Sequence, residues 1–187
     1  MISRNLIDSI LDRYALPRNG IHGLPHWARV LENGRKLSQV TGAKTRVVEL
    51  FAVFHDSLRI NDGIDEGHGR RGAELARELR GIEYELADGD FDLLINACDL
   101  HTAGHLEGDI TIQTCWDADR LDLGRVGITP RAEKLCTHRA KDPGFFKWAI
   151  ERGKGCLFRT SFCQSGESDC NKVDTCCGVW GRTKISD

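Results

Sequence analysis

The sequence predicts an all-α protein, and three observations support this fold class. Apolar residues recur at helical spacing through most of residues 1–150. The longest apolar stretch, Val47–Phe54, contains Glu49 and is too short to span a membrane, but it is typical of a helix buried inside a bundle. Alternating strand patterns are scarce, and the one candidate, Ile110–Ile112, is too short to build a sheet.

The first three helices follow from periodicity and from turn residues. Apolar positions from Leu6 to Tyr14 predict a helix that ends before Asn19-Gly20. Positions from Val30 to Val40 predict a second helix, closed by Thr41-Gly42. Residues 46–56 are apolar on nearly every face, so we expect the third helix at the centre of the bundle.

Three more helices complete the predicted bundle. Gly69–Arg80 is amphipathic and is followed by Gly81 as a stop signal. Apolar positions from Phe91 to His101 predict the next helix. Thr129-Pro130 combines an N-cap residue with a proline at the first helical position, which predicts a last helix through Leu135.

Length and charge limit the protein's class. The chain has 187 residues, enough for one ordinary domain, and its formal net charge of -2 gives no electrostatic sign of a nucleic-acid polymer or an anionic membrane as partner. The opening MISRNLIDSILDRY has charges within its apolar pattern and no small-residue cleavage site, unlike a secretory signal. We therefore expect a cytoplasmic protein; the oligomeric state is not indicated.

Composition changes near Gly153. Residues 1–152 are expected to form the helical domain, whereas residues 153–187 are rich in Cys, Gly and Ser and show no helical period, which predicts a short, irregular and poorly ordered tail. The tail's cysteines are not spaced as C-x-x-C and no histidine follows them, so a zinc site there is poorly supported.

The residues that suggest chemistry are imidazoles and carboxylates in apolar surroundings. His55-Asp56 ends the most apolar helix, and burying both groups is costly unless they pair with each other or bind a metal ion. His26 begins the second helix, with His22 one turn before it as a residue that could orient it. Asp117 lies between Trp116 and Ala118; of Asp117, Asp119 and Asp122, one is expected to point inward to a cation.

The ordered set His26, His55-Asp56 and Asp117 resembles the H…HD…D pattern of the HD-domain superfamily. The flanking segments H-G-L-P-H-W-A-R-V, F-H-D-S-L-R-I-N-D-G, H-G-R-R-G-A-E-L-A and W-D-A-D-R-L-D-L-G-R-V-G-I are similar to those of small bacterial HD proteins, over about residues 1–152. The resemblance implies an all-helical bundle in which these four residues coordinate a divalent metal ion. Two imidazoles and two carboxylates suit Mn, Fe, Co, Ni or Zn.

A second metal ion is an open alternative at this stage. His68 opens a segment that is similar to the H-x-x-x-G-A segment of HD-GYP phosphodiesterases, where that histidine binds a second ion, and His101 lies where the same proteins supply another ligand. The implied metal ligands are then His26, His55, Asp56, His68, His101 and Asp117, around one or two ions. With one ion, His68 and His101 would instead contact phosphate.

The resemblance implies a metal-dependent phosphohydrolase that cleaves a phosphomonoester or phosphodiester, with a nucleotide as one option, through metal-activated water. The catalytic residues expected are Asp56, His55, Arg59 and His101, of which Arg59 would neutralise phosphate charge. One alternative is a di-iron HD-type oxygenase, as in myo-inositol oxygenase, and another is a module that binds metal or nucleotide without turnover. The partner expected in the first case is a small phosphorylated substrate.

Overall fold

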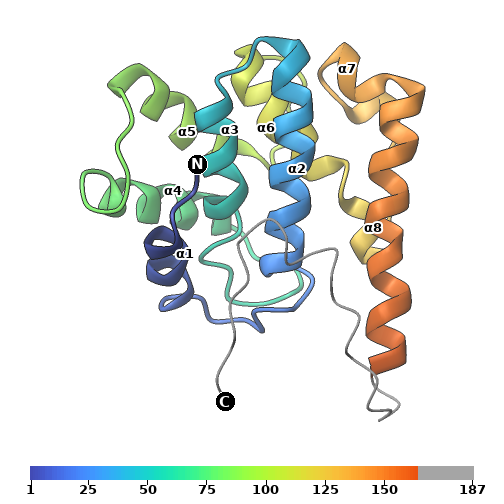
Figure 1. Cartoon of the computed structure of the whole chain (residues 1–187), viewed down its shortest axis with the longest axis horizontal. Helices are drawn as coiled ribbons and strands as arrows, with labels where there is room; N and C mark the ends of the chain where they lie inside the picture. The colour runs from blue at the N-terminus through green and yellow to red at the C-terminus, as the bar shows by residue number, and fades with distance from the viewer. Residues whose placement is uncertain (164–187) are drawn as a thin grey trace.

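The all-α prediction is confirmed by the computed structural model, which describes the backbone of residues 1–163 and the side chains of residues 1–153. Within that range the chain forms α-helices joined by loops and two short 3₁₀ helices, and no β-strand (Figure 1). The α-helices are α1 (Arg4–Leu11), α2 (Leu24–Thr41), α3 (Thr45–Phe54), α4 (His68–Leu79), α5 (Asp88–Leu100), α6 (Ile110–Arg120), α7 (His138–Lys141) and α8 (Pro143–Cys163). The 3₁₀ helices are η1 (Leu123–Val126) and η2 (Ala132–Lys134).

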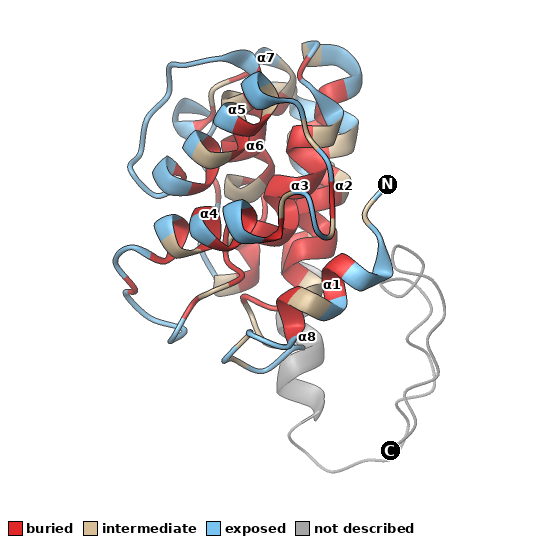
Figure 2. Ribbon diagram, turned by 90° about the vertical axis from the view of Figure 1, so that its left-hand side faces the viewer, coloured by how far each residue is buried: buried red, intermediate tan, exposed pale blue. Residues whose placement is uncertain are grey.

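Helix α3 forms the middle of the bundle, as its apolar sequence predicts. It packs against α2, α4, α5 and α6, and every side chain in Val47–Phe54 is buried (Figure 2). Burying one large aliphatic or aromatic side chain stabilises a fold by about 1.5–3 kcal/mol, so α3 is the main hydrophobic anchor. The C-terminal end of α3 is therefore held firmly in the bundle, and residues 55 and 56, which directly follow it, are held there as well.

The boundaries of α2 follow from glycine and proline. Gly23 is the N-cap and Pro25 lies in the first turn, where its missing N–H costs nothing. Gly42 ends the helix in the left-handed conformation with φ 76°, as the Thr41-Gly42 signal predicts. The helix starts earlier than its apolar period indicated, so His26 lies in its first turn.

Two glycines allow α4 to approach its neighbours closely. A Cβ atom on Gly72 would lie 2.1 Å from the carbonyl oxygen of Phe54, at the end of α3, and one on Gly69 would lie 2.3 Å from the carbonyl oxygen of Cys98 on α5. No side chain fits at either position without moving backbone. The start of α4 is thereby held against the ends of α3 and α5.

Residues 110–112, whose alternation is too short to build a sheet, are the first turn of α6, and Asp109 caps this helix by accepting a hydrogen bond from the Thr111 amide. Two other sequence predictions differ from the structure in detail. The Thr129-Pro130 signal does not start an α-helix; only the 3₁₀ turn η2 follows it. The predicted boundary at Gly153 falls inside α8, because that helix continues to Cys163. The remainder of the predicted tail, residues 164–187, lies outside the described residues.

No helix in the described part of the chain combines the length and the apolar character needed to cross a lipid bilayer.

Candidate metal centre

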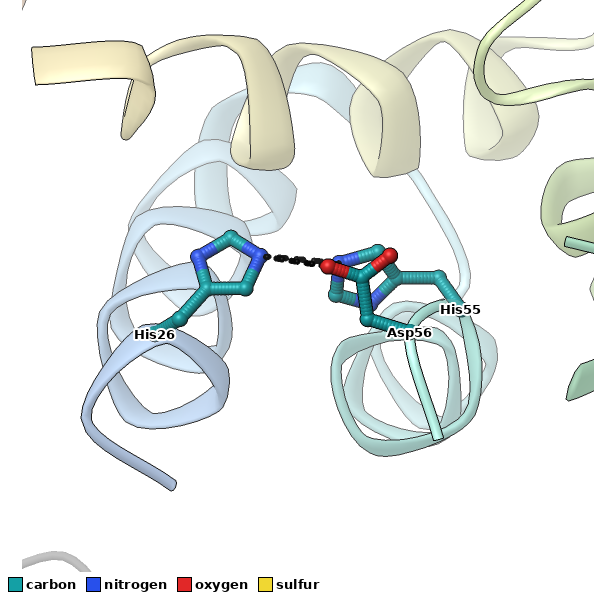
Figure 3. A group of neighbouring side chains, drawn as sticks. All are labelled: His26, His55 and Asp56. Atoms are coloured by element: carbon teal, nitrogen blue, oxygen red, sulfur yellow. Dashed lines mark hydrogen bonds and ion pairs between the residues drawn. The ribbon is translucent and has the colours of Figure 1, made fainter. Parts of the chain in front are cut away.

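Six side chains from five helices or helix ends converge at one end of the bundle. His26 comes from the first turn of α2, and His55 and Asp56 directly follow α3 (Figure 3). His68 is the first residue of α4, and His101 directly follows α5. Asp119 lies in the last turn of α6. The positions at helix ends let each side chain reach a common point without breaking a helix.

Every imidazole of this group is oriented through its Nδ1 atom. His26 Nδ1 lies 2.7 Å from Asp122 Oδ2, and His55 Nδ1 lies 3.1 Å from the carbonyl oxygen of Phe51. His68 Nδ1 lies 2.6 Å from the carbonyl oxygen of Asp65, and His101 Nδ1 lies 2.7 Å from the carbonyl oxygen of Cys98. Carboxylate and carbonyl oxygens only accept hydrogen bonds, so each Nδ1 carries the hydrogen.

The Nε2 atoms face one another in two pairs. His26 Nε2 and His55 Nε2 are 3.0 Å apart, and His68 Nε2 and His101 Nε2 are 2.9 Å apart. With the hydrogen on Nδ1, a neutral ring has a lone pair on Nε2, so the two lone pairs of each close pair repel each other, and a proton or a metal ion between them would remove that repulsion. Two nitrogens that bind one ion at about 2.1 Å lie roughly 3.0–3.4 Å apart, depending on the coordination geometry, which is close to both separations.

Asp56 lies between the two histidine pairs. Its Oδ2 atom is 3.6 Å from His26 Nε2 and 3.8 Å from His55 Nε2. Its Oδ1 atom is 3.2 Å from His68 Nε2 and 3.7 Å from His101 Nε2. The ligand atoms of His26, His55 and Asp56 lie within 4.8 Å of one another, and so do those of Asp56, His68 and His101. One carboxylate thus serves both groups.

Asp119, and not Asp117, faces the first of these groups. Its Oδ1 atom is 3.4 Å from His26 Nε2 and 3.7 Å from His55 Nε2. The same atom is buried and has no hydrogen-bond partner among the described residues. A buried carboxylate oxygen without a donor is costly, and a cation at this point removes the cost.

The prediction that Asp117 is a metal ligand is therefore wrong. Its Oδ1 accepts a hydrogen bond from the amide of Cys136 at 2.7 Å. Its Oδ2 accepts from the amide of Thr137 at 2.7 Å and from the Thr137 hydroxyl at 2.8 Å. Successive residues of a helix differ by about 100° in direction, so two positions apart point to nearly opposite sides. Asp117 anchors the segment before α7, while Asp119 faces the histidines.

The electrostatics of the group favour neutral imidazoles at His26 and His55 and an ionised carboxylate at Asp56. Burial, assisted by the charge of Arg125, holds the pKa of His26 well below its usual range, and burial lowers the pKa of His55 to about 4. Burial alone would raise the pKa of Asp56, but the surrounding histidines outweigh it and hold the pKa well below its usual value. Neutral nitrogen and anionic oxygen are the protonation states that bind metal ions.

His101 differs from His26 and His55 in its titration. Burial lowers its pKa, but the interaction with the Asp56 carboxylate and the charge of Asp119 outweigh this effect, and the net shift is upward. A proton on His101 and a metal ion would have the same effect, because each places a positive charge beside the Asp56 carboxylate. The two groups of side chains could therefore each hold a metal ion.

A cavity of about 300 Å³ gives access to the group. Its walls include Asp56, His68, His101 and Asp119, and the apolar Leu123. His26 and His55 have no exposed surface and lie behind that wall. Such a cavity is at the small end of the range for small-molecule sites.

Five further polar residues line the cavity: His22, Arg59, Asp62, Thr102 and Arg125. His22 Nδ1 lies 2.7 Å from Asp56 Oδ2, so His22 contacts Asp56 and makes no hydrogen bond with His26, which it was expected to orient. Arg59 NH1 is 3.1 Å from His68 Nε2 and 3.5 Å from Asp56 Oδ1, so the expected arginine does lie beside the centre.

The chain matches no protein-family model, no curated protein and no solved structure.

The geometry thus brings together five of the six predicted metal ligands, the exception being Asp117. Sequence reasoning missed two residues of the site. Asp119 was one of three closely spaced aspartates, and its helical phase relative to Ala118 and Leu121 was the available signal. Arg125 follows the aspartate-rich segment in a Gly-containing stretch, and no pattern in the sequence distinguishes it from a surface arginine.

Proposed function

We propose that this protein is a metal-dependent phosphohydrolase of the HD type that acts on a small phosphorylated substrate. The observation that carries the proposal is the pairing of histidine Nε2 atoms on both sides of Asp56, with every Nδ1 hydrogen already engaged elsewhere. A cation on each side of Asp56 would relieve the repulsion between the lone pairs of both histidine pairs, which supports two ions over one.

His26, His55, Asp56 and Asp119 would hold one ion, and Asp56, His68 and His101 the other. Divalent Mn, Fe, Co, Ni or Zn suits this mixture of imidazole and carboxylate ligands. Such ions supply Lewis acidity, which makes water more acidic and draws charge from a phosphoryl oxygen.

The protein's own groups fix the geometry around that chemistry. Asp122, Phe51, Asp65 and Cys98 each hold one imidazole in a single orientation, so little reorganisation is needed when substrate arrives. Arg59 lies against Asp56 and lines the cavity, where its guanidinium group would contact a phosphoryl oxygen.

Metal analysis followed by a panel of phosphate esters tests the proposal. The purified protein is expected to hold up to two transition-metal ions per chain and to release phosphate from a member of the panel. His55→Ala and Asp56→Ala should abolish phosphate release, whereas the exposed Arg70→Ala should not. Equal rates for the parent and both centre variants would show that the activity belongs elsewhere.

A second variant separates two ions from one. Because His68 contacts only the Oδ1 side of Asp56, His68→Ala should lower the metal content from about two ions to about one. A parent protein that holds only one ion, unchanged by His68→Ala, would contradict the two-ion centre.

A di-iron oxygenase is the second candidate function. It requires His68 and His101 both to be ligands, and their Nε2 atoms do converge beside Asp56 Oδ1. The two arginines in the cavity favour an anionic substrate and hence the hydrolase. Two bound irons with oxygen-dependent turnover would support the oxygenase, and phosphate release stimulated by manganese or cobalt would support the hydrolase.

The state of the cysteines indicates in which cellular compartment the protein works. Cys98, Cys115 and Cys136, the cysteines whose side chains the structure describes, are free thiols. Free thiols are usual in a reducing environment, which supports a cytoplasmic setting for the proposed enzyme.

A further inference from the structure

Arg125 is buried, and backbone carbonyl groups hold the Nε and NH1 atoms of its guanidinium group. It lies on η1, and its Nε atom donates to the carbonyl oxygen of Ile21 at 2.8 Å. Its NH1 atom donates to the carbonyl oxygen of Asp122 at 3.3 Å. These two contacts hold the guanidinium plane with its NH2 end toward the cavity, which Arg125 lines.

The NH2 end of Arg125 has no acceptor among the described residues. His22 Nδ1 lies 3.5 Å from this NH2 atom, but that nitrogen already donates to Asp56 Oδ2 at 2.7 Å and has no lone pair to offer. Asp56 Oδ2 is 4.0 Å from NH2, and Asp119 Oδ1 is 3.8 Å from NH1. Both oxygens are beyond hydrogen-bond distance, so a cationic donor is left unused beside the centre.

Arg59 is the counterpart of Arg125 across Asp56. Its NH1 atom lies 3.5 Å from Asp56 Oδ1, whereas Arg125 NH2 is nearest to Oδ2. Its NH2 atom donates to the carbonyl oxygen of Gly63 at 2.7 Å, so this guanidinium is also held from the backbone side. One arginine therefore stands beside each half of the centre.

The charges indicate what these arginines bind. Among the ligands that the proposed function assigns, only Asp56 and Asp119 are anionic, and two divalent ions would more than neutralise them. Neither carboxylate would then compensate Arg59 and Arg125, which are both buried, and Asp62, the third acidic residue of the cavity wall, is exposed to solvent. An uncompensated buried cation is costly, and an anionic ligand in the cavity removes that cost.

We propose that Arg125, together with Arg59, clamps a phosphoryl group that carries two negative charges, so that the substrate is a phosphomonoester and not a phosphodiester. This inference rests on the proposed function and adds to it the substrate class and a specificity-determining residue. A dianion compensates the excess positive charge better than the single charge of a diester. The cavity of about 300 Å³ also suits a substrate with one organic substituent.

The test measures binding of inorganic phosphate, a dianion near neutral pH, to the metal-loaded protein by calorimetry. Arg125→Gln removes the charge and should weaken phosphate binding about tenfold or more, with metal content unchanged. Arg70→Ala, which removes an exposed arginine, should bind phosphate as the parent does. Arg125→Lys keeps a charge but loses the planar fork, and a smaller loss is expected.

Substrate choice gives a second readout. The parent should hydrolyse p-nitrophenyl phosphate in preference to bis(p-nitrophenyl) phosphate, and Arg125→Gln should reduce that preference. If Arg125→Gln does not fold, Arg125→Lys provides the comparison, since it retains the charge.

The outcomes separate the two levels of the proposal. Unchanged phosphate affinity in both Arg125 variants, or a parent that prefers the diester, would overturn this inference while the metal centre stands. A parent that binds no divalent ion at all would overturn the proposed function, and this inference with it.

Discussion

Asp122 accepts a hydrogen bond from His26 Nδ1 at 2.7 Å and is itself held by Arg29, whose Nε atom lies 2.6 Å from Asp122 Oδ1. All three residues are buried. This chain of contacts fixes the ring of His26 with Nε2 directed at His55 and Asp56. The Asp122 carboxylate therefore fixes the orientation of the His26 ring, although the two residues come from different parts of the fold.

Replacing Asp122 by Asn should weaken metal binding without removing a ligand. The neutral amide is a poorer acceptor and can turn its NH₂ group toward His26, which favours the wrong tautomer. Loss of such a supporting contact typically costs 10–100-fold in metal affinity. Competition with a metal-sensitive dye measures the change, and the exposed Asp92→Asn on α5 is the control. Equal affinities in both variants would contradict the orienting role.

The two aspartates of α6 should give opposite results. Asp119→Asn is expected to lower metal content, because it removes the carboxylate facing His26 and His55. Asp117→Asn should keep the metal but lower the free energy of unfolding by about 1–3 kcal/mol, since Asp117 accepts three hydrogen bonds from residues 136 and 137. Metal analysis and thermal unfolding of both variants provide the comparison. Metal loss in Asp117→Asn alone would restore the assignment made from the sequence.

Gly69 should not tolerate a methyl group. In Gly69→Ala the new Cβ would lie 2.3 Å from the Cys98 carbonyl oxygen and 2.9 Å from His101 Nδ1, so α4 or α5 must shift. The expected cost is about 1–3 kcal/mol of stability, with loss of the ion beside His101. Gly89→Ala on α5 is the matched control: nothing lies within 4 Å of its Cβ, and it should stabilise by about 0.5–1 kcal/mol. Similar melting temperatures for both variants would refute the close packing.

Glu49 should make stability depend on pH in the acid range. Burial alone would raise its pKa, but hydrogen bonding to Arg35 at 2.8 Å and the charge of that residue bring the pKa below the ordinary 4.5. Because the folded pKa is the lower one, the ionised carboxylate contributes stability above about pH 4.5, and this contribution is lost as the pH falls toward the folded pKa. Urea unfolding of the parent and Glu49→Gln should therefore differ most near neutrality and converge in acid. A difference that is constant down to pH 3 would exclude this linkage.

The sequence was sufficient to predict an element where only one structure could satisfy its pattern of residues. The run around Leu50 is apolar on all faces, and only a central helix can bury it, so both α3 and the place of His55 follow. Glycine and proline likewise fixed the limits of α2. For Thr129-Pro130 the same local signal was not enough, since a cap starts a helix only where an apolar face follows, and residues 131–134 offer none.

The choice between Asp117 and Asp119 needed tertiary structure. An aspartate flanked by Trp116 and Ala118 is expected to be buried, and it is, but burial does not reveal its partner. Asp119 keeps 15% of its side-chain surface exposed because it faces the cavity, so the deeper aspartate was the wrong choice. Arg125 was missed for a related reason: the carbonyl groups that position it come from Ile21 and Asp122, and only the folded chain brings these together.

The distribution of the proposed ligands over five helices or helix ends also determines whether metal binding precedes or follows folding. In an unfolded chain only His55 and Asp56 are neighbours, and two adjacent donors hold an ion weakly. The remaining donors come together only when the helices have docked, so we expect metal ions to enter an assembled bundle and not to nucleate its folding. Once bound, they would fasten α2 through α6 to one another, and chelation should loosen the whole assembly at once.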